Sequence, residues 1–275
     1  MENKISVYGG TGFIGSNFIQ SYEDRCTSIS RDDRTPKSDC ILYFISTTHN
    51  YHVFDDLQRD IDTNLRVLSE VLDQCRDRDV TINFVSSWFV YGDTQLPANE
   101  DSYCKPKGFY SITKRCAEQL VESYCKTFGK NYRILRLSNV YGPRDRGASK
   151  KKNALQYLTD RLKNNETIDL YHGGRFHRDY LHVSDICRAI NLVLEEGDLN
   201  QIYNIGSGRA YVFRDLINHI IKKTGSRSKI NEIDSSDFHK LVQVKNMQLT
   251  VEKLKRLGFE PTISIEQGLD ELCQI

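Results

Sequence analysis

A glycine-rich turn close to the N-terminus constrains the possible folds of this chain more than any other feature. Residues 9–15 read Gly-Gly-Thr-Gly-Phe-Ile-Gly and satisfy both the GxxGxxG and the GxGxxG spacing. The turn follows a strand-like run at 4–8 and precedes helical spacing of apolar residues at 16–22. Glycines in this context let a pyrophosphate approach the backbone N–H groups at the positive end of a helix. The pattern predicts a dinucleotide-binding turn, and the residues expected to contact the cofactor are Gly9, Gly12, Phe13, Ile14 and Gly15.

Strand-like and helical segments alternate through the first half of the chain. Strand-like runs lie at 40–46, 82–86 and 133–137, and helical segments at 60–76 and 110–128 separate them. This alternation predicts an α/β fold, a doubly wound parallel sheet of the Rossmann type with helices on both faces.

The helical segment 60–76 carries apolar residues at successive +4 and +3 steps. These residues are Ile61, Leu65, Leu68, Leu72 and Cys75. Such spacing places them on one stripe of a helix, which either packs into the core or is shared with a second subunit.

The connection at 32–39 is too short for the usual topology. Its eight residues separate Arg31 from the strand that begins at Cys40. A helical crossover between parallel strands needs at least about 10–12 residues, so no helix fits, whereas eight extended residues reach about 26 Å and can cover a return path of about 20 Å. We therefore expect the sheet to lack one strand and one helix of the usual doubly wound half, leaving the adenine end of a bound dinucleotide unusually open.

The character of the sequence changes after Tyr141. Gly142-Pro143 breaks the chain, charged stretches follow, and the predicted helices at 154–163 and 213–224 are separated by long connections. We predict a dinucleotide-binding domain of residues 1–142 plus about 183–204, and a smaller mixed α/β substrate domain of residues 143–182 and 205–275.

The end of the second strand predicts which dinucleotide is bound. An acidic residue there suits a free ribose 2′-hydroxyl, and a basic residue suits a 2′-phosphate. This chain has both, because Ser30 and Arg31 are followed by Asp32 and Asp33. Ser30 and Arg31 come first at the strand edge and are expected to contact the cofactor, which favours NADP while leaving NAD open.

One tyrosine and lysine pair is a candidate for catalysis. YxxxK spacing occurs at Tyr103/Lys107 and Tyr110/Lys114, but Pro106 interrupts the first pair. Tyr110 and Lys114 can share a helix face, where the ammonium group, beside a cationic nicotinamide, would lower the pKa of the phenol. Ser87 follows a strand, at the edge of the sheet where ligands bind, and can join a proton relay.

Composition excludes several classes of function. Lys plus Arg (38) balance Asp plus Glu (37), so no basic field favours nucleic acid, and no apolar run approaches a membrane span. The eight cysteines include no CxxC pair and are expected to be reduced thiols of a cytosolic protein. His49 and His52 have HxxH spacing without a cysteine or acidic partner pattern, so no metal site is predicted.

Motifs along nearly the whole chain resemble those of the extended short-chain dehydrogenase/reductase family, specifically the NAD(P)-dependent nucleotide-sugar epimerases and dehydratases. The segments that carry the resemblance are 9–15, Ser86-Ser87 with Val90-Tyr91-Gly92, Tyr110/Lys114, 139–143, 178–185, 203–208, and 258–261 with 266–269. They are specific for the family and far less so for the reaction.

The resemblance implies roles for individual residues. Tyr110 would be the catalytic base, Lys114 would hold the nicotinamide ribose, and Ser87 would bind the sugar oxygen that is oxidised. Asn139 and Arg178 would contact the diphosphate of a nucleotide-sugar, with a structural salt bridge as the alternative role of Arg178. The family also pairs subunits through two helices each, which implies a homodimer through 60–76 and 110–128.

The residues after Ser87 separate the possible reactions. Family dehydratases have an acidic pair where this chain has Trp88 and Phe89, and neither side chain can transfer protons. The minimal site of Ser87, Tyr110 and Lys114 favours an epimerase that acts through a keto sugar, as UDP-glucose 4-epimerase does. An NADPH-dependent reductase of keto sugars and a non-catalytic NAD(P) sensor are the alternatives. The arginine usual before the last helices has no match in 240–247, where Lys240 or Lys245 could substitute.

Overall fold

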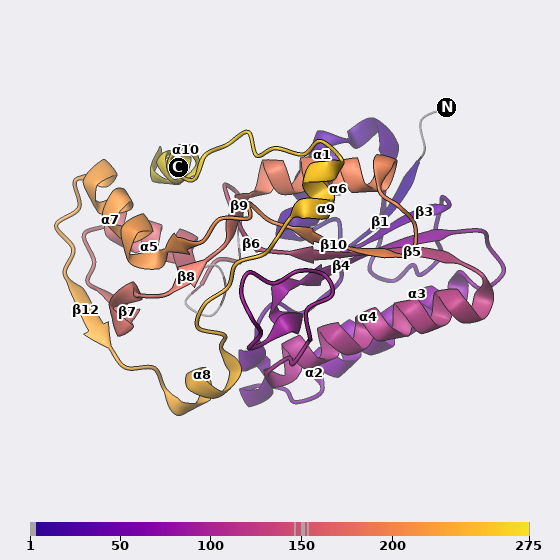
Figure 1. The fold of residues 1–275 in the computed structure, drawn as a ribbon, viewed down its shortest axis with the longest axis horizontal. Helices are drawn as coiled ribbons and strands as arrows, with labels where there is room; N and C mark the ends of the chain where they lie inside the picture. Colours follow the sequence, from indigo (N-terminus) through magenta and orange to yellow (C-terminus); the bar gives the residue numbers. More distant parts are fainter. Residues whose placement is uncertain (1–3, 146, 150–151, 153, 275) are drawn as a thin grey trace.

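A large parallel sheet forms the centre of the molecule (Figure 1). The computed structural model describes residues 4–145, 147–149, 152 and 154–274, and within them this sheet has six strands. Their spatial order is β2 (Cys26–Ile29), β1 (Ile5–Tyr8), β3 (Cys40–Tyr43), β4 (Thr81–Ser87), β5 (Asn131–Leu137) and β10 (Gln201–Ile205). All neighbouring pairs are parallel. The predicted α/β fold with a Rossmann-type sheet is confirmed.

Helices cover both faces of the large sheet (Figure 1). Helices α1 (Phe13–Ser21) and α6 (Val183–Glu196) pack on one face with α9 (Glu252–Arg256), and α3 (Val67–Gln74) and α4 (Gly108–Phe128) pack on the other. Successive side chains of a strand point to opposite faces, so Leu135 joins the first core and Ile134 the second. Burial on both faces explains why β1 and β3 are nearly continuous apolar runs.

The short connection at 32–39 contains no regular helix, as predicted. Strands β2 and β3 pair with opposite sides of β1, so the chain crosses β1 in this loop. The hydroxyl oxygen of Ser6 accepts the backbone N–H groups of Lys37 and Ser38 at 2.8 and 2.9 Å. The loop is therefore fixed against β1, and β2 is left as an edge strand.

The predicted helix at 60–76 has a different internal geometry. It consists of α2 (Arg59–Ile61), a π-helical turn η3 (Asp62–Arg66) and α3. Leu68 and Cys75 are buried in the core, whereas Ile61 is 45% exposed. A π-helical turn contains one more residue than an α-helical turn, so it rotates the residues before it away from the buried side. The stripe is therefore divided between the core, which takes Leu68 and Cys75, and the surface, which takes Ile61.

Outside the large sheet and its covering helices, the described residues form three longer helices and three small sheets. Helices α5 (Ala154–Lys163) and α7 (Phe213–Thr224) are confirmed at their predicted bounds, and they share a core with α10 (Ile265–Gln274). The small sheets among the described residues pair β6 (Asn139–Tyr141) with β9 (Tyr180–His182), β7 (Ile168–Tyr171) with β12 (Ile230–Ile233), and β8 (His177–Arg178) with β11 (Tyr211–Val212).

The last part of the chain returns to the large sheet. Val244, Met247 and Phe259 lie in the same core as β1 and α6. The division of the chain at 142, 183 and 205 stays a prediction, and these contacts show that 244–259 packs against the larger part.

Short helices complete the described structure. They are η1 (Glu23–Arg25), η2 (Asn50–Phe54), η4 (Trp88–Tyr91), η5 (His172–Gly174) and α8 (Asp237–Val242). No helix in the described ranges combines the length and apolar character needed to cross a membrane. All eight cysteines are free thiols.

Candidate active site

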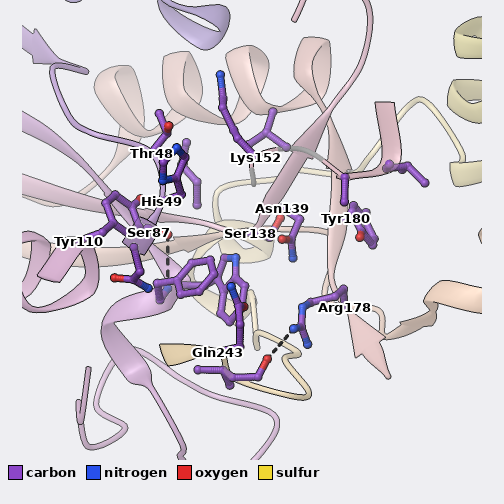
Figure 2. Close-up of a pocket in the computed structure, with 18 of the residues that line it drawn as sticks. Thr48, His49, Ser87, Tyr110, Ser138, Asn139, Lys152, Arg178, Tyr180 and Gln243 are labelled. Atoms are coloured by element: carbon purple, nitrogen blue, oxygen red, sulfur yellow. Dashed lines mark hydrogen bonds between the residues drawn. The ribbon is translucent and has the colours of Figure 1, made fainter. Parts of the chain in front are cut away.

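The carboxyl ends of the central strands open into a cleft of about 740 Å³ (Figure 2). The glycine turn, the end of β4 and the start of α4 form one side of it, and residues of β7, β8 and α8 contribute the other. The predicted site residues that line this cleft are Gly9, Gly12, Phe13, Ile14, Gly15, Ser87, Tyr110, Lys114, Asn139 and Arg178. Ser30 and Arg31 do not line it. The structure therefore brings together residues that are up to 169 positions apart in the sequence, Gly9 and Arg178.

The glycine turn has the backbone geometry of a phosphate cradle. Gly9 has a φ of +80°, which favours glycine, and its carbonyl oxygen accepts the N–H of Gly12 at 3.1 Å. A Cβ atom at Gly15 would lie 2.4 Å from the same carbonyl oxygen, so no side chain fits there. Helix α1 begins at Phe13 and directs its first N–H groups to this turn. The residues present fit a dinucleotide pyrophosphate.

Ser87 and Tyr110 lie in contact at the end of β4 (Figure 2). Ser87 is the N-cap of η4, where its Oγ accepts the N–H of Phe89 at 3.3 Å. Burial raises the pKa of Tyr110, and a hydrogen bond with Ser87 opposes that shift. The two hydroxyl groups face a common part of the cleft, where they can share a proton with a ligand oxygen.

The ammonium group of Lys114 points beneath the cleft toward β4. Its Nζ donates to the carbonyl oxygen of Val85 at 2.6 Å and lies 4.1 Å from the ring centroid of Phe84. Burial lowers the pKa of Lys114 to about 7. The expected lowering of the Tyr110 pKa does not arise from the protein alone, because burial of the phenol dominates and Lys114 is not among the groups that shift it.

Asn139 and Arg178 lie toward the other end of the cleft (Figure 2). The Asn139 Nδ2 donates to the carbonyl oxygen of Asp179 at 2.9 Å. The Arg178 guanidinium donates to the carbonyl oxygens of Val244 and Lys245, and burial lowers its pKa to about 10. Within the described ranges Arg178 forms no ion pair, so the structural salt bridge considered from the sequence is not found.

Ser30 and Arg31 lie just beyond the end of edge strand β2, outside the cleft lining. Asp33 is held by its neighbours, because its carboxylate accepts the N–H of Thr35 at 2.8 Å and pairs with Lys37 at 2.9 Å. Arg31 and Asp32 are exposed, and their side chains have no hydrogen-bond or ion-pair partner among the described residues.

Comparison with known families decides the classification of the chain. The model of the NAD dependent epimerase/dehydratase family matches residues 32–206, which is more than half of the chain. The chain belongs to this family. The matched range includes Ser87, Tyr110 and Lys114 and begins after the glycine turn.

The chain also resembles individual proteins and solved structures over nearly its whole length. It is 27% identical to the low-salt glycan biosynthesis protein Agl12 of Haloferax volcanii, covering 97% of this chain and 96% of that protein. The UDP-glucose 4-epimerase of Thermus thermophilus in complex with NAD has a TM-score of 0.86 at 21% identity, with 98% of each chain covered. RMD of Pseudomonas aeruginosa in complex with NADPH has a TM-score of 0.85 at 22% identity, covering 99% of this chain and 98% of that one.

Several residues that line the cleft of this epimerase/dehydratase family member were not predicted. They are Thr47, Thr48, His49, Ser138, Tyr171, His172, Tyr180, His239 and Gln243. Thr48 and His49 follow the end of β3, so the rule that singled out Ser87 could have found them. Residues of α8 have no such local signal. His239 reaches the cleft through tertiary contacts, including a 2.7 Å hydrogen bond between its Nδ1 and the hydroxyl of Tyr51.

Proposed function

We propose that this chain is an NAD(P)-dependent nucleotide-sugar epimerase of the UDP-glucose 4-epimerase type. The observation that carries the proposal is that Ser87 and Tyr110 lie side by side in the cleft that begins at the glycine turn (Figure 2). Family membership and the likeness to the Thermus thermophilus epimerase support it.

Each catalytic side chain has a role that follows from its position. Tyr110 takes the proton of the sugar hydroxyl and returns it after the keto sugar has presented its other face. The Oγ of Ser87 accepts the N–H of Phe89, so its own hydrogen is available to the sugar oxygen. The glycine turn and Lys114 would hold a nicotinamide dinucleotide, which would supply reversible hydride transfer with the sugar carbon. Lys114, at the base of the same cleft, would hold the ribose of that nucleotide.

The two residues after Ser87 favour epimerisation over water elimination. Trp88 and Phe89 both line the cleft, and neither has a group that transfers protons. Epimerisation requires only the base, the serine and the cofactor. Asn139 and Arg178, at the other end of the cleft, are placed to contact the diphosphate of the substrate.

We favour NADP over NAD because Arg31 comes before Asp32 at the end of β2. Asp33 is engaged by Lys37 and the backbone, whereas Arg31 and Asp32 are both exposed, so the guanidinium of Arg31 can turn toward a 2′-phosphate. The likeness to structures that contain NAD and NADPH is compatible with either dinucleotide. The same feature makes an NADPH-dependent reductase of nucleotide-linked keto sugars the second candidate.

We propose that the chain forms a homodimer. The solvent-facing sides of α2 and α4 would form the interface. Ile112 and Leu120 are eight residues apart on α4 and are 50% and 39% exposed, and Ile61 on α2 is 45% exposed. Large apolar side chains repeated along one side of a helix are typical of an interface with a like surface.

The decisive experiment offers the purified protein a panel of UDP-, GDP-, CDP- and dTDP-sugars without added reductant. We expect interconversion of C4 epimers, detected by NMR, with no net use of NADPH. Tyr110→Phe should reduce turnover about 10²–10⁴-fold while cofactor binding changes little. Stoichiometric consumption of NADPH would favour the reductase, and absence of turnover with every sugar would overturn both enzymatic readings.

A further inference from the structure

An aromatic wall stands beside the catalytic phenol. The ring of Phe89 meets the ring of Tyr110 edge-on, with centroids 5.9 Å apart and an interplanar angle of 77°. Trp88 stacks on Phe89 with centroids 4.0 Å apart. All three rings line the cleft. Any sugar whose hydroxyl reaches Tyr110 and Ser87 must therefore place a neighbouring part of its ring near Phe89.

This wall offers a substrate few hydrogen bonds. Phe89 has an apolar side chain, and its backbone N–H already donates to Ser87. Trp88 is nearly fully buried, and the guanidinium of Arg178 lies 5.2 Å from its ring. That guanidinium is directed to the carbonyl oxygens of Val244 and Lys245. A polar substituent packed against the Phe89 ring would lose water there without gaining a partner from that ring, which is costly for a hydroxyl and more so for a carboxylate.

Sugar chemistry limits which substituent can face an apolar wall. In a 4-epimerisation the reacting carbon has two ring neighbours, C3 and C5. C3 carries a hydroxyl in common hexoses and pentoses, whereas C5 carries hydrogen in a pentose, methyl in a 6-deoxyhexose, hydroxymethyl in a hexose and carboxylate in a uronic acid. Only the C5 side of the ring can therefore present an apolar substituent to Phe89, and it does so in a pentose or a 6-deoxyhexose.

We propose that the substrate is a nucleotide-linked pentose or 6-deoxyhexose, and that Phe89 selects it by packing against the C5 side of the sugar. This inference rests on the proposed epimerase function and narrows its substrate class. Phe89 contacts the sugar in this arrangement but transfers no proton, so it determines specificity and not the chemistry of the reaction.

The test uses three sugars that differ only at C5. The sugars are xylose, glucose and glucuronic acid, each linked to the nucleoside diphosphate that the panel identifies. At C5 they carry hydrogen, hydroxymethyl and carboxylate respectively. Affinity in the presence of cofactor is measured by calorimetry, and 4-epimerisation by NMR. We expect the xylose compound to be preferred over the glucose compound by about tenfold, and over the glucuronic acid compound by more.

Variants at Phe89 separate specificity from folding. Phe89→Ser opens space and adds a hydroxyl, so the preference for xylose over glucose should fall to about threefold or less. Phe89→Leu keeps the wall apolar and should retain most of the preference. Phe128→Ser, at the exposed end of α4 outside the cleft, is the matched control and should leave the preference unchanged.

The outcomes distinguish this inference from the proposed function. Equal turnover and affinity for all three sugars, unchanged in Phe89→Ser, would overturn the inference and leave the epimerase intact. Binding and turnover of no sugar with any base would overturn the proposed function and the inference with it. A preference for xylose that Phe89→Ser abolishes would support both.

Discussion

The buried ammonium group of Lys114 couples the active site to the stability of the fold. Burial lowers its pKa to about 7 from its ordinary value of 10.5, against the opposing charge of Glu118. Below pH 7 both the folded and the unfolded chain carry this proton, whereas between pH 7 and 10.5 only the unfolded chain does. The unfolded state then binds more protons, so the contribution of Lys114 to stability increases with pH in this window.

Replacing Lys114 by methionine should remove that pH dependence. The free energy of unfolding of wild type, relative to Lys114→Met, is expected to rise between pH 7 and 10 by up to about 1.4 kcal/mol per pH unit. Urea denaturation at several pH values measures the difference. Lys130→Met, which removes a partly exposed lysine instead of the buried one, is measured in parallel as the control. If the difference in the free energy of unfolding between wild type and Lys114→Met does not change with pH, the pKa of Lys114 is not lowered by burial.

Arg31 is the residue at which cofactor choice can be tested. A guanidinium that meets a 2′-phosphate forms charge-assisted hydrogen bonds, so Arg31→Ser should weaken NADP binding by about tenfold or more. NAD binding should change little, because its ribose has no phosphate at that position. Fluorescence titration with both dinucleotides measures the two affinities. Arg66→Ser is the control, since Arg66 is an exposed arginine that pairs with Asp62. An equal effect on both dinucleotides would argue against NADP.

Helix α4 carries the catalytic tyrosine and is fixed to the sheet by a buried ion pair. Glu118 accepts hydrogen bonds from Arg136 of β5 at 3.0 and 2.8 Å, and both side chains are almost fully buried. Burial alone would raise the pKa of Glu118, but the hydrogen bonds and charge of Arg136 outweigh it and leave this pKa below its ordinary value. The pair holds α4, and therefore Tyr110, in place against β4 and β5.

Breaking this pair should destabilise the whole domain. Glu118→Gln leaves the Arg136 charge buried without its partner, so we expect a loss of about 3–5 kcal/mol in the free energy of unfolding. Asp73→Asn breaks an ion pair with Arg76 that is exposed on both sides and should cost less than about 1 kcal/mol. Urea denaturation compares the two variants. Similar small losses in both would show that the buried pair is not needed for stability.

The assembly of the whole molecule can be tested through the apolar side of α4. Ile112→Asp places a charge in the proposed interface, so the dimer should dissociate at micromolar concentration while the fold is retained. Analytical ultracentrifugation measures the mass, and circular dichroism checks the fold. Leu199→Asp, in the connection between α6 and β10, changes a similarly exposed leucine and should leave the dimer intact. A monomeric wild-type protein would contradict the proposed partner.

At the scale of the molecule, the sequence predicted those features that depend on neighbouring residues. The glycine turn between β1 and α1, the helical spacing of Tyr110 and Lys114, and the length of the 32–39 connection are all local. Local backbone geometry and the length that a chain segment can span limit the structures that such segments adopt. These three features could therefore be predicted from the sequence alone.

Tertiary structure decided what depends on contacts between distant segments. The π-helical turn at 62–66 exposed Ile61, the carbonyl oxygens of 244–245 oriented Arg178, and the carbonyl oxygen of Val85 in β4 accepted the Lys114 ammonium. The composition of the cleft wall, including His239, was likewise set by packing. A side chain takes its direction and pKa from the groups that surround it in three dimensions, and sequence spacing does not specify those groups.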